Sequence, residues 1–161
     1  ASMVDLPDDD GLVGIFNNIT STMLMMDSDV ELGATMESMG ARLYCTAVLG
    51  MPGPSPITVA VSSDEEGASS LACALFALEH HELEESMLSD TMAELSNIFS
   101  GQLKGSLNLN QSLGLPKVLQ LQQFMPALNE DTWHHIAVQC GDAAVLLSIS
   151  TSPEVVGHYI S

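Results

Sequence analysis

The segment from about Glu84 to Ser106 constrains the fold of this chain more than any other feature of its sequence. At about 100° of rotation per residue, its large apolar side chains fall within one narrow stripe of a helix. The stripe consists of Leu88, Met92, Leu95, Phe99 and Leu103. Because a helix of this kind must bury its apolar stripe against another layer, the rest of the chain has to supply that layer.

Strand-like segments occur on both sides of this helix in the sequence and can form the second layer. They span residues 42–49, 57–62, 114–124, 133–139 and 143–151. Two further helices are predicted. Residues 11–26 carry apolar side chains at three- and four-residue spacing, and residues 63–79 begin with a capping box formed by Ser63 and Glu66. Residues 30–38 are only weakly patterned.

The predicted helices and strands are grouped along the chain and do not alternate strictly. This grouping predicts an α+β fold of a single domain, in which the helices pack on a mainly antiparallel sheet. A helix followed by strands occurs twice, from residue 11 and again from residue 84, which suggests duplicated helix–strand halves. We expect residues 1–10 to be a flexible acidic N-terminus and residues 11–161 to form the domain.

The charge of the chain argues against two classes of partner. Its 161 residues include 21 Asp and Glu but only 3 Lys and Arg, for a formal net charge of −18. Such a surface repels phosphate backbones and anionic lipids, so nucleic acid and the membrane surface are poor partners. No segment offers the roughly 20 apolar residues of a membrane-spanning helix, and the N-terminus lacks the cationic start of a signal peptide. We therefore expect no membrane insertion and a cytoplasmic localisation.

A row of polar residues lies opposite the apolar stripe of the 84–106 helix. Asp90, Glu94, Asn97 and Gly101 follow one another at spacings of four, three and four residues, which places them on one outward face. A carboxylate and a carboxamide therefore project side by side, and Gly101 leaves room for a close approach. On spacing alone, a solvated polar face with a tolerated glycine explains this pattern better, because Glu-x-x-Asn is very common in sequences.

The other chemistry-bearing residues do not form a recognisable site. Adjacent histidines do not converge on one metal ion, since His80 and His81 fall in a loop and His134 and His135 point to opposite sides of a strand. The three cysteines lie far apart among apolar neighbours, as buried thiols do. No glycines form a nucleophile elbow around a serine, and no phosphate-binding glycine pattern is present. We predict no metal site in this chain.

Residues 84–105 carry Glu-x-x-Asn at Glu94 and Asn97, then Gly101, and residues 113–118 follow as Leu-Gly-Leu-Pro-Lys-Val. This combination resembles the CheX branch of the CheC/CheX/FliY chemotaxis phosphatases, whose helix carries a Glu-x-x-Asn signature followed by Gly and later by a Pro-containing strand. The order of predicted elements agrees with that family over roughly residues 11–151. The resemblance thus covers most of the chain.

The resemblance implies hydrolysis of the aspartyl phosphate on a CheY-like response-regulator receiver. It assigns to Asn97 the orientation of the attacking water and to Glu94 a contact with a lysine at the receiver's active site. We expect Asp90 and Gly101, in the same row, to border the partner. The receiver would supply the Mg²⁺, so no cofactor of this chain's own is expected, and members of this branch resemble one another in forming homodimers.

The helix at 11–26 departs from the pattern of family members that have two sites. The residue three positions before Asn17 is Gly14, and the one before Asn18 is Ile15, so the glutamate is missing in both registers. We therefore expect one site per chain, with the first helix serving packing.

Two other classes of function remain open from the sequence. The chain could be a non-catalytic adaptor that binds a receiver or a flagellar or signalling partner. It could also be an acidic structural domain whose exposed Glu94 and Asn97 have no role.

Overall fold

The computed structural model describes residues 5–31, 43–124, 126–127 and 130–159. Its six-stranded sheet has the order β1-β5-β6-β3-β2-β4. The strands are β1 (Ser28–Val30), β2 (Cys45–Met51), β3 (Ile57–Ser63), β4 (Lys117–Leu119), β5 (His134–Cys140) and β6 (Ala143–Ser150). The helices are α1 (Asp9–Met23), α3 (Glu65–Phe76), η1 (His80–Glu82), α4 (Glu85–Ser106), α5 (Leu121–Phe124) and α6 (Pro153–Tyr159).

Every pair of neighbouring strands in this sheet is antiparallel. Exchanging β1 with β4, β2 with β5 and β3 with β6 gives the same strand order read from the opposite edge of the sheet. The units α1–β1–β2–β3 and α4–β4–β5–β6 are thus related by a pseudo-two-fold axis between β3 and β6. The predicted α+β fold, its antiparallel sheet and its duplicated halves are confirmed.

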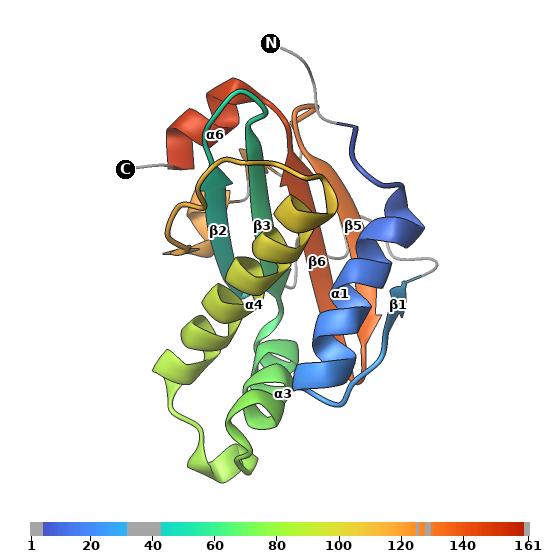
Figure 1. The fold of residues 1–161 in the computed structure, drawn as a ribbon. Coiled ribbons are helices and arrows are strands. Elements are labelled where there is room, and N and C mark those ends of the chain that lie inside the picture. The colour runs from blue at the N-terminus through green and yellow to red at the C-terminus, as the bar shows by residue number, and fades with distance from the viewer. Residues whose placement is uncertain (1–4, 32–42, 125, 128–129, 160–161) are drawn as a thin grey trace.

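The two long helices of these halves, α1 and α4, cover the same face of the sheet, as Figure 1 shows. Their apolar stripes and the facing side chains of the central strands form the main core. Phe16 of α1 and Phe99 of α4 are both fully buried, and their rings meet edge to face with centroids 6.0 Å apart. The α4 stripe predicted from the sequence is therefore the buried side of the helix.

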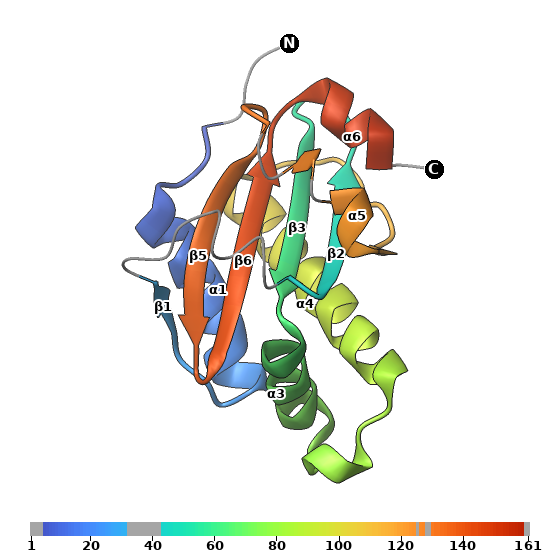
Figure 2. The ribbon, with the colours of Figure 1, turned by 180° about the vertical axis from the view of Figure 1, so that it is seen from behind.

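A second, smaller core lies on the other face of the sheet, where α5 and α6 cover one end of it (Figure 2). Phe124 and Trp133 are buried there, and their rings meet edge to face with centroids 5.6 Å apart. β2 and β3 are buried on both sides because the main core covers one face of the sheet and this smaller core covers the other.

Several boundaries differ from those predicted. α1 begins at Asp9, because Asp8 caps the helix by accepting the N–H of Gly11 at 2.8 Å, so part of the expected N-terminal segment is helical. α3 is capped by Asp64 and not by Ser63, whose hydroxyl instead donates to the carbonyl of Ala144 across the sheet. The capping box predicted for Ser63 is therefore wrong.

The predicted strand at 114–124 is also wrong over most of its length. β4 forms three residue pairs with β2, and the chain then turns into the short helix α5. β1 and α6 were not predicted, and β1 begins ahead of the weakly patterned segment 30–38. Residues 32–38 of that segment lie outside the described residues, as does the first residue of the strand predicted at 42–49.

Candidate functional site

Three residues of the predicted polar row project from the exposed side of α4. Asp90, Glu94 and Asn97 are all exposed, whereas Leu95 and Phe99 on the opposite side are fully buried. In the described part of the chain, no hydrogen bond or ion pair engages the side chains of Glu94 and Asn97. Both groups are therefore available to a partner without first breaking an internal contact.

A hollow of about 390 Å³ lies over these residues. Asp90, Glu94 and Asn97 line it from α4, and Leu115 and Pro116 line it from the segment that leads into β4. Leu115 is 84% exposed. The hollow thus combines a polar wall with an apolar one, and the apolar wall was not predicted as part of the site.

Two contacts hold the Leu115–Pro116 segment beside α4. The N–H of Gly114 donates to the carbonyl of Gly50 at 2.8 Å. A Cβ at position 114 would lie only 2.6 Å from that oxygen, so this approach requires glycine. The buried side chain of Gln111 donates to the carbonyls of Met51 and Ser55 and accepts the N–H of Ser55. The connection after α4 is thereby fixed to the β2–β3 hairpin, and this fixes the apolar wall.

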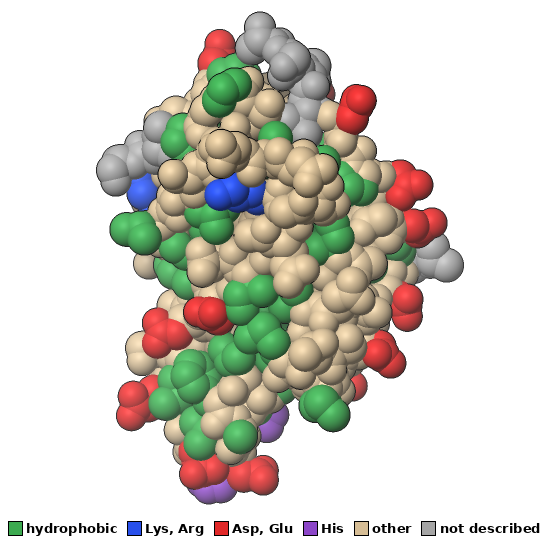
Figure 3. Space-filling model, in the orientation of Figure 1, with side chains coloured by type: hydrophobic (Ala, Val, Ile, Leu, Met, Phe, Trp, Pro, Cys, Tyr) green, Lys and Arg blue, Asp and Glu red, His purple; other side chains and the backbone are tan. Residues whose placement is uncertain are grey.

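The electrostatics of the hollow favour a partner that brings positive charge. Asp90 and Glu94 lie four residues apart on one helix face, and like charges at this spacing repel each other. None of the described residues that line the hollow is a lysine, arginine or histidine. In Figure 3, which views this face, acidic side chains lie mainly along the margins and hydrophobic ones gather over the region of α3 and α4.

The chemistry available in the hollow is limited. Its described lining contains no cysteine, serine, threonine or histidine that could act as a nucleophile or as a neutral base. The carboxamide of Asn97 can both donate and accept hydrogen bonds and does not titrate. The hollow can therefore position a water molecule or bind a partner, and the carboxylates of Asp90 and Glu94 are the groups in its described lining that could act as a base or a nucleophile.

Gly101 lies apart from this hollow. It borders a second depression between α4 and α1, which is lined also by Ile15 and Ile98. A Cβ at position 101 would meet the side chain of Leu113 at 3.8 Å, an ordinary contact. The predicted proximity of Gly101 to a partner bound at Asn97 therefore remains a prediction, and the space around Gly101 does not demand glycine.

The first helix uses its asparagine differently. Asn17 is half-buried, and its side-chain oxygen accepts the N–H of Ser28 at 2.8 Å, which ties α1 to β1. Asn18 is exposed, and the residue three positions before it is Ile15 and not a glutamate. This contact gives Asn17 a packing role, and the expectation of one site per chain stays a prediction.

The histidines and cysteines lie in unremarkable surroundings. His80 and His81 are exposed in η1, and His134 and His135 point to opposite sides of β5, as the strand pattern predicts. Burial raises the pKa of the Cys45 thiol, which keeps it protonated and unreactive. Within the described ranges, no three His, Cys, Asp or Glu side chains form a cluster suited to a metal ion. In the same ranges, no helix has the length and apolar character needed to cross a bilayer.

Residues 45–137 match the family Chemotaxis phosphatase CheX. No curated protein matches the chain in sequence. The matched residues contain the whole of α4, with Glu94 and Asn97, and the Leu115–Pro116 segment. Since the match spans more than half of the chain, the chain belongs to the CheX family of chemotaxis phosphatases.

Solved structures with this fold are similar over most of the chain. The chemotaxis protein CheX from Vibrio vulnificus is 14% identical, with a TM-score of 0.66 over 86% of this chain and 92% of that one. A CheX–CheY complex with BeF3 and Mg²⁺ from Borrelia burgdorferi includes a similar chain at 13% identity and a TM-score of 0.64, covering 91% and 98%. FliY from Thermotoga maritima is 12% identical, with a TM-score of 0.58 over 92% and 89%. At these identities the likeness shows the fold.

Proposed function

We propose that this chain hydrolyses the aspartyl phosphate of a CheY-like receiver, with Asn97 and Glu94 as the residues that act on it. The observation that carries the proposal is the exposed, unengaged pair of Glu94 and Asn97 on α4 of a CheX-family domain. A similar chain from Borrelia burgdorferi forms a complex with CheY, BeF3 and Mg²⁺. That complex supports a receiver as the partner and the receiver as the source of Mg²⁺.

Asn97 is suited to orienting the attacking water. Phosphoryl transfer passes through a loose transition state, so in-line placement of water matters more than a strong base. The Asn97 carboxamide can accept a hydrogen bond from the water and donate another without changing its charge. Because no described residue engages it, this geometry can be set by the bound receiver.

Glu94 is suited to binding a cation of the receiver. A carboxylate beside a phosphoryl group is repelled unless a positive charge lies between them. The described lining of the hollow supplies no such charge, and Asp90 adds a second negative one. A lysine at the receiver's active site would compensate the negative charges of Glu94 and Asp90. Glu94 is therefore suited to binding that lysine.

The direct test follows the loss of phosphate from the organism's own phosphorylated receivers with and without the chain. Acceleration at substoichiometric amounts of the chain would establish turnover. Binding of the phosphorylated receiver without acceleration would instead support the adaptor function. If no receiver is bound and none is dephosphorylated faster, the remaining hypothesis is an acidic structural domain.

Replacing Glu94 by glutamine is expected to raise KM for the phosphorylated receiver by about 10- to 100-fold, because the partner's lysine then loses its charged counterpart. The value of kcat should change much less, since Asn97 still places the water. Steady-state kinetics against one receiver separate the two parameters. Glu66→Gln, at an exposed position in the first turn of α3, is the matched control and should leave both unchanged. A fall in kcat with KM unchanged would contradict the assigned role.

Replacing Leu115 by serine is expected to raise KM by about tenfold, because the docked receiver covers this exposed side chain and gains from its burial. The free energy of unfolding should hardly change, since Leu115 buries little surface in the free chain. Kinetics and thermal melting measure the two effects. Met25→Ser removes an apolar side chain that is 86% exposed outside the hollow, and it should leave KM unchanged. A KM equal to that of the unaltered chain would exclude Leu115 from the docking surface.

Asp90 and Gly101 extend this proposal as residues that border the docked receiver. Homodimerisation and a cytoplasmic location, both implied by the family, also remain proposals. Sedimentation velocity of the purified chain tests the dimer.

A further inference from the structure

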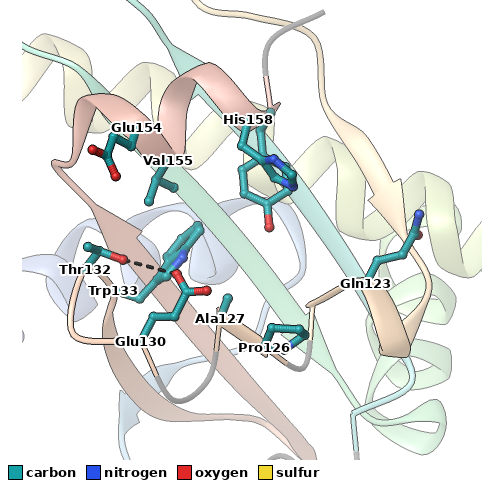
Figure 4. A pocket seen from close by; sticks show the side chains of 10 residues that line it. Gln123, Pro126, Ala127, Glu130, Thr132, Trp133, Glu154, Val155 and His158 are labelled. Carbon is teal, nitrogen blue, oxygen red and sulfur yellow. Dashed lines mark hydrogen bonds between the residues drawn. The ribbon is translucent and has the colours of Figure 1, made fainter.

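A second pocket lies on the face of the sheet opposite α4, at the end that α6 covers (Figure 4). Its volume is about 330 Å³, within the range of small-molecule sites. It shares no lining residue with the hollow at Asn97. Buried or half-buried Ala127, Trp133, Val155 and Tyr159 line its inner part, and more exposed residues form its rim.

Trp133 is rigidly held in this pocket. It is only 6% exposed, and it stacks on His135 with ring centroids 6.3 Å apart and an angle of 11° between the planes. Its edge contact with Tyr159 has a centroid distance of 6.1 Å. The indole N–H donates to no group among the described residues. The pocket therefore presents a fixed aromatic floor at little cost in conformational entropy.

Two carboxylates at the rim make the pocket negative. Glu130 precedes β5 and Glu154 lies in the first turn of α6, and Figure 4 shows them on either side of Trp133. No lysine or arginine is present in the described lining, and its only basic side chain is the imidazole of His158 in the last turn of α6. Burial, and next the charge of Glu130, raises the pKa of Tyr159, so its phenol stays neutral.

We propose that this pocket binds a small organic cation, an ammonium compound whose apolar part packs on Trp133 and Tyr159 while its charge faces Glu130 and Glu154. Aromatic rings attract such cations through their negative faces, and the carboxylates add a direct charge interaction. An anion would be repelled by both carboxylates and by the net charge of −18. A metal ion would gain nothing from the aromatic floor.

The fluorescence of Trp133 gives a direct test, because it is the single tryptophan of the 161 residues. The probes are choline and its neutral isostere 3,3-dimethylbutan-1-ol, neither of which absorbs at the excitation wavelength. We expect a saturable response to choline with an affinity at least about tenfold higher than for the isostere. The response should weaken in 1 M salt. An equal response to both probes, or none to choline, would overturn the proposal.

Charge-removing variants test the role of the rim. The double variant Glu130→Gln/Glu154→Gln is expected to weaken choline binding by about tenfold or more. Glu66→Gln/Asp142→Asn removes the same charge from α3 and from the turn between β5 and β6, both outside the pocket lining, and should bind choline as the unaltered chain does. All four positions are exposed, so both variants should melt like the unaltered chain. Unchanged choline binding in the rim variant would overturn the proposal. A Trp133 fluorescence change that depends only on protein concentration would also overturn it, because the pocket would then bind a second copy of the chain.

Discussion

Replacing Asn97 by alanine is expected to slow receiver dephosphorylation by about 100-fold while leaving receiver binding intact. The substitution removes the only carboxamide in the described lining of the hollow at α4, so no uncharged polar side chain remains there to orient the water. Binding should persist because, in the proposed complex, Glu94 and Leu115 still contact the receiver. The measurement compares kcat with the affinity for a receiver held in its phosphorylated form by BeF3.

Asn17→Ala is the matched control for this experiment. It removes the equivalent kind of side chain from α1, where Asn17 accepts the N–H of Ser28. Loss of that hydrogen bond should lower the free energy of unfolding by about 1 kcal/mol and leave kcat unchanged. Full acceleration by the Asn97→Ala variant would exclude the proposed mechanism, and equal losses in both variants would indicate damage to the fold.

The sequence predicted the elements that carry strong periodic patterns. α4 was placed within one residue of its observed start, because its buried stripe repeats from Leu88 to Leu103, over about four turns of the helix. The prediction failed where the pattern was short or ambiguous. Ser63 and Asp64 are both good capping residues, and the pairing of Ser63 with Cys45 in the sheet leaves the cap to Asp64. β1, with three residues at the sheet edge, carries too little pattern to be recognised.

The candidate site was predictable to the same extent. The face shared by Glu94 and Asn97 follows from helical spacing, and their exposure agrees with it. The apolar wall at Leu115 depends on the contact of Gly114 with Gly50, which joins residues more than sixty positions apart. The pocket at Trp133 likewise forms only where α6 meets the loop before β5. Spacing along one element cannot predict such tertiary contacts.

The second large expected effect is a loss of stability when the buried side of α4 is altered. Phe99→Ala is expected to lower the free energy of unfolding by about 3–5 kcal/mol, because it leaves a cavity at the edge-to-face contact with Phe16. A loss of this size is a large part of the roughly 5–15 kcal/mol that stabilises a typical domain. Chemical denaturation followed by circular dichroism measures it.

Two further variants make this experiment decisive. Phe99→Leu fills most of the space and should cost less than about 1.5 kcal/mol, so it remains folded if Phe99→Ala does not. Phe76→Ala removes the same ring from an exposed position, 40% accessible at the end of α3, and should cost less than about 1 kcal/mol. Equal losses at Phe99 and Phe76 would contradict the packing of α4 on α1. Because Asn97 lies two residues away on the opposite side of the same helix, Phe99→Leu should also raise KM less than Glu94→Gln does. The packing of α4 would then be separated experimentally from the chemistry of its exposed face.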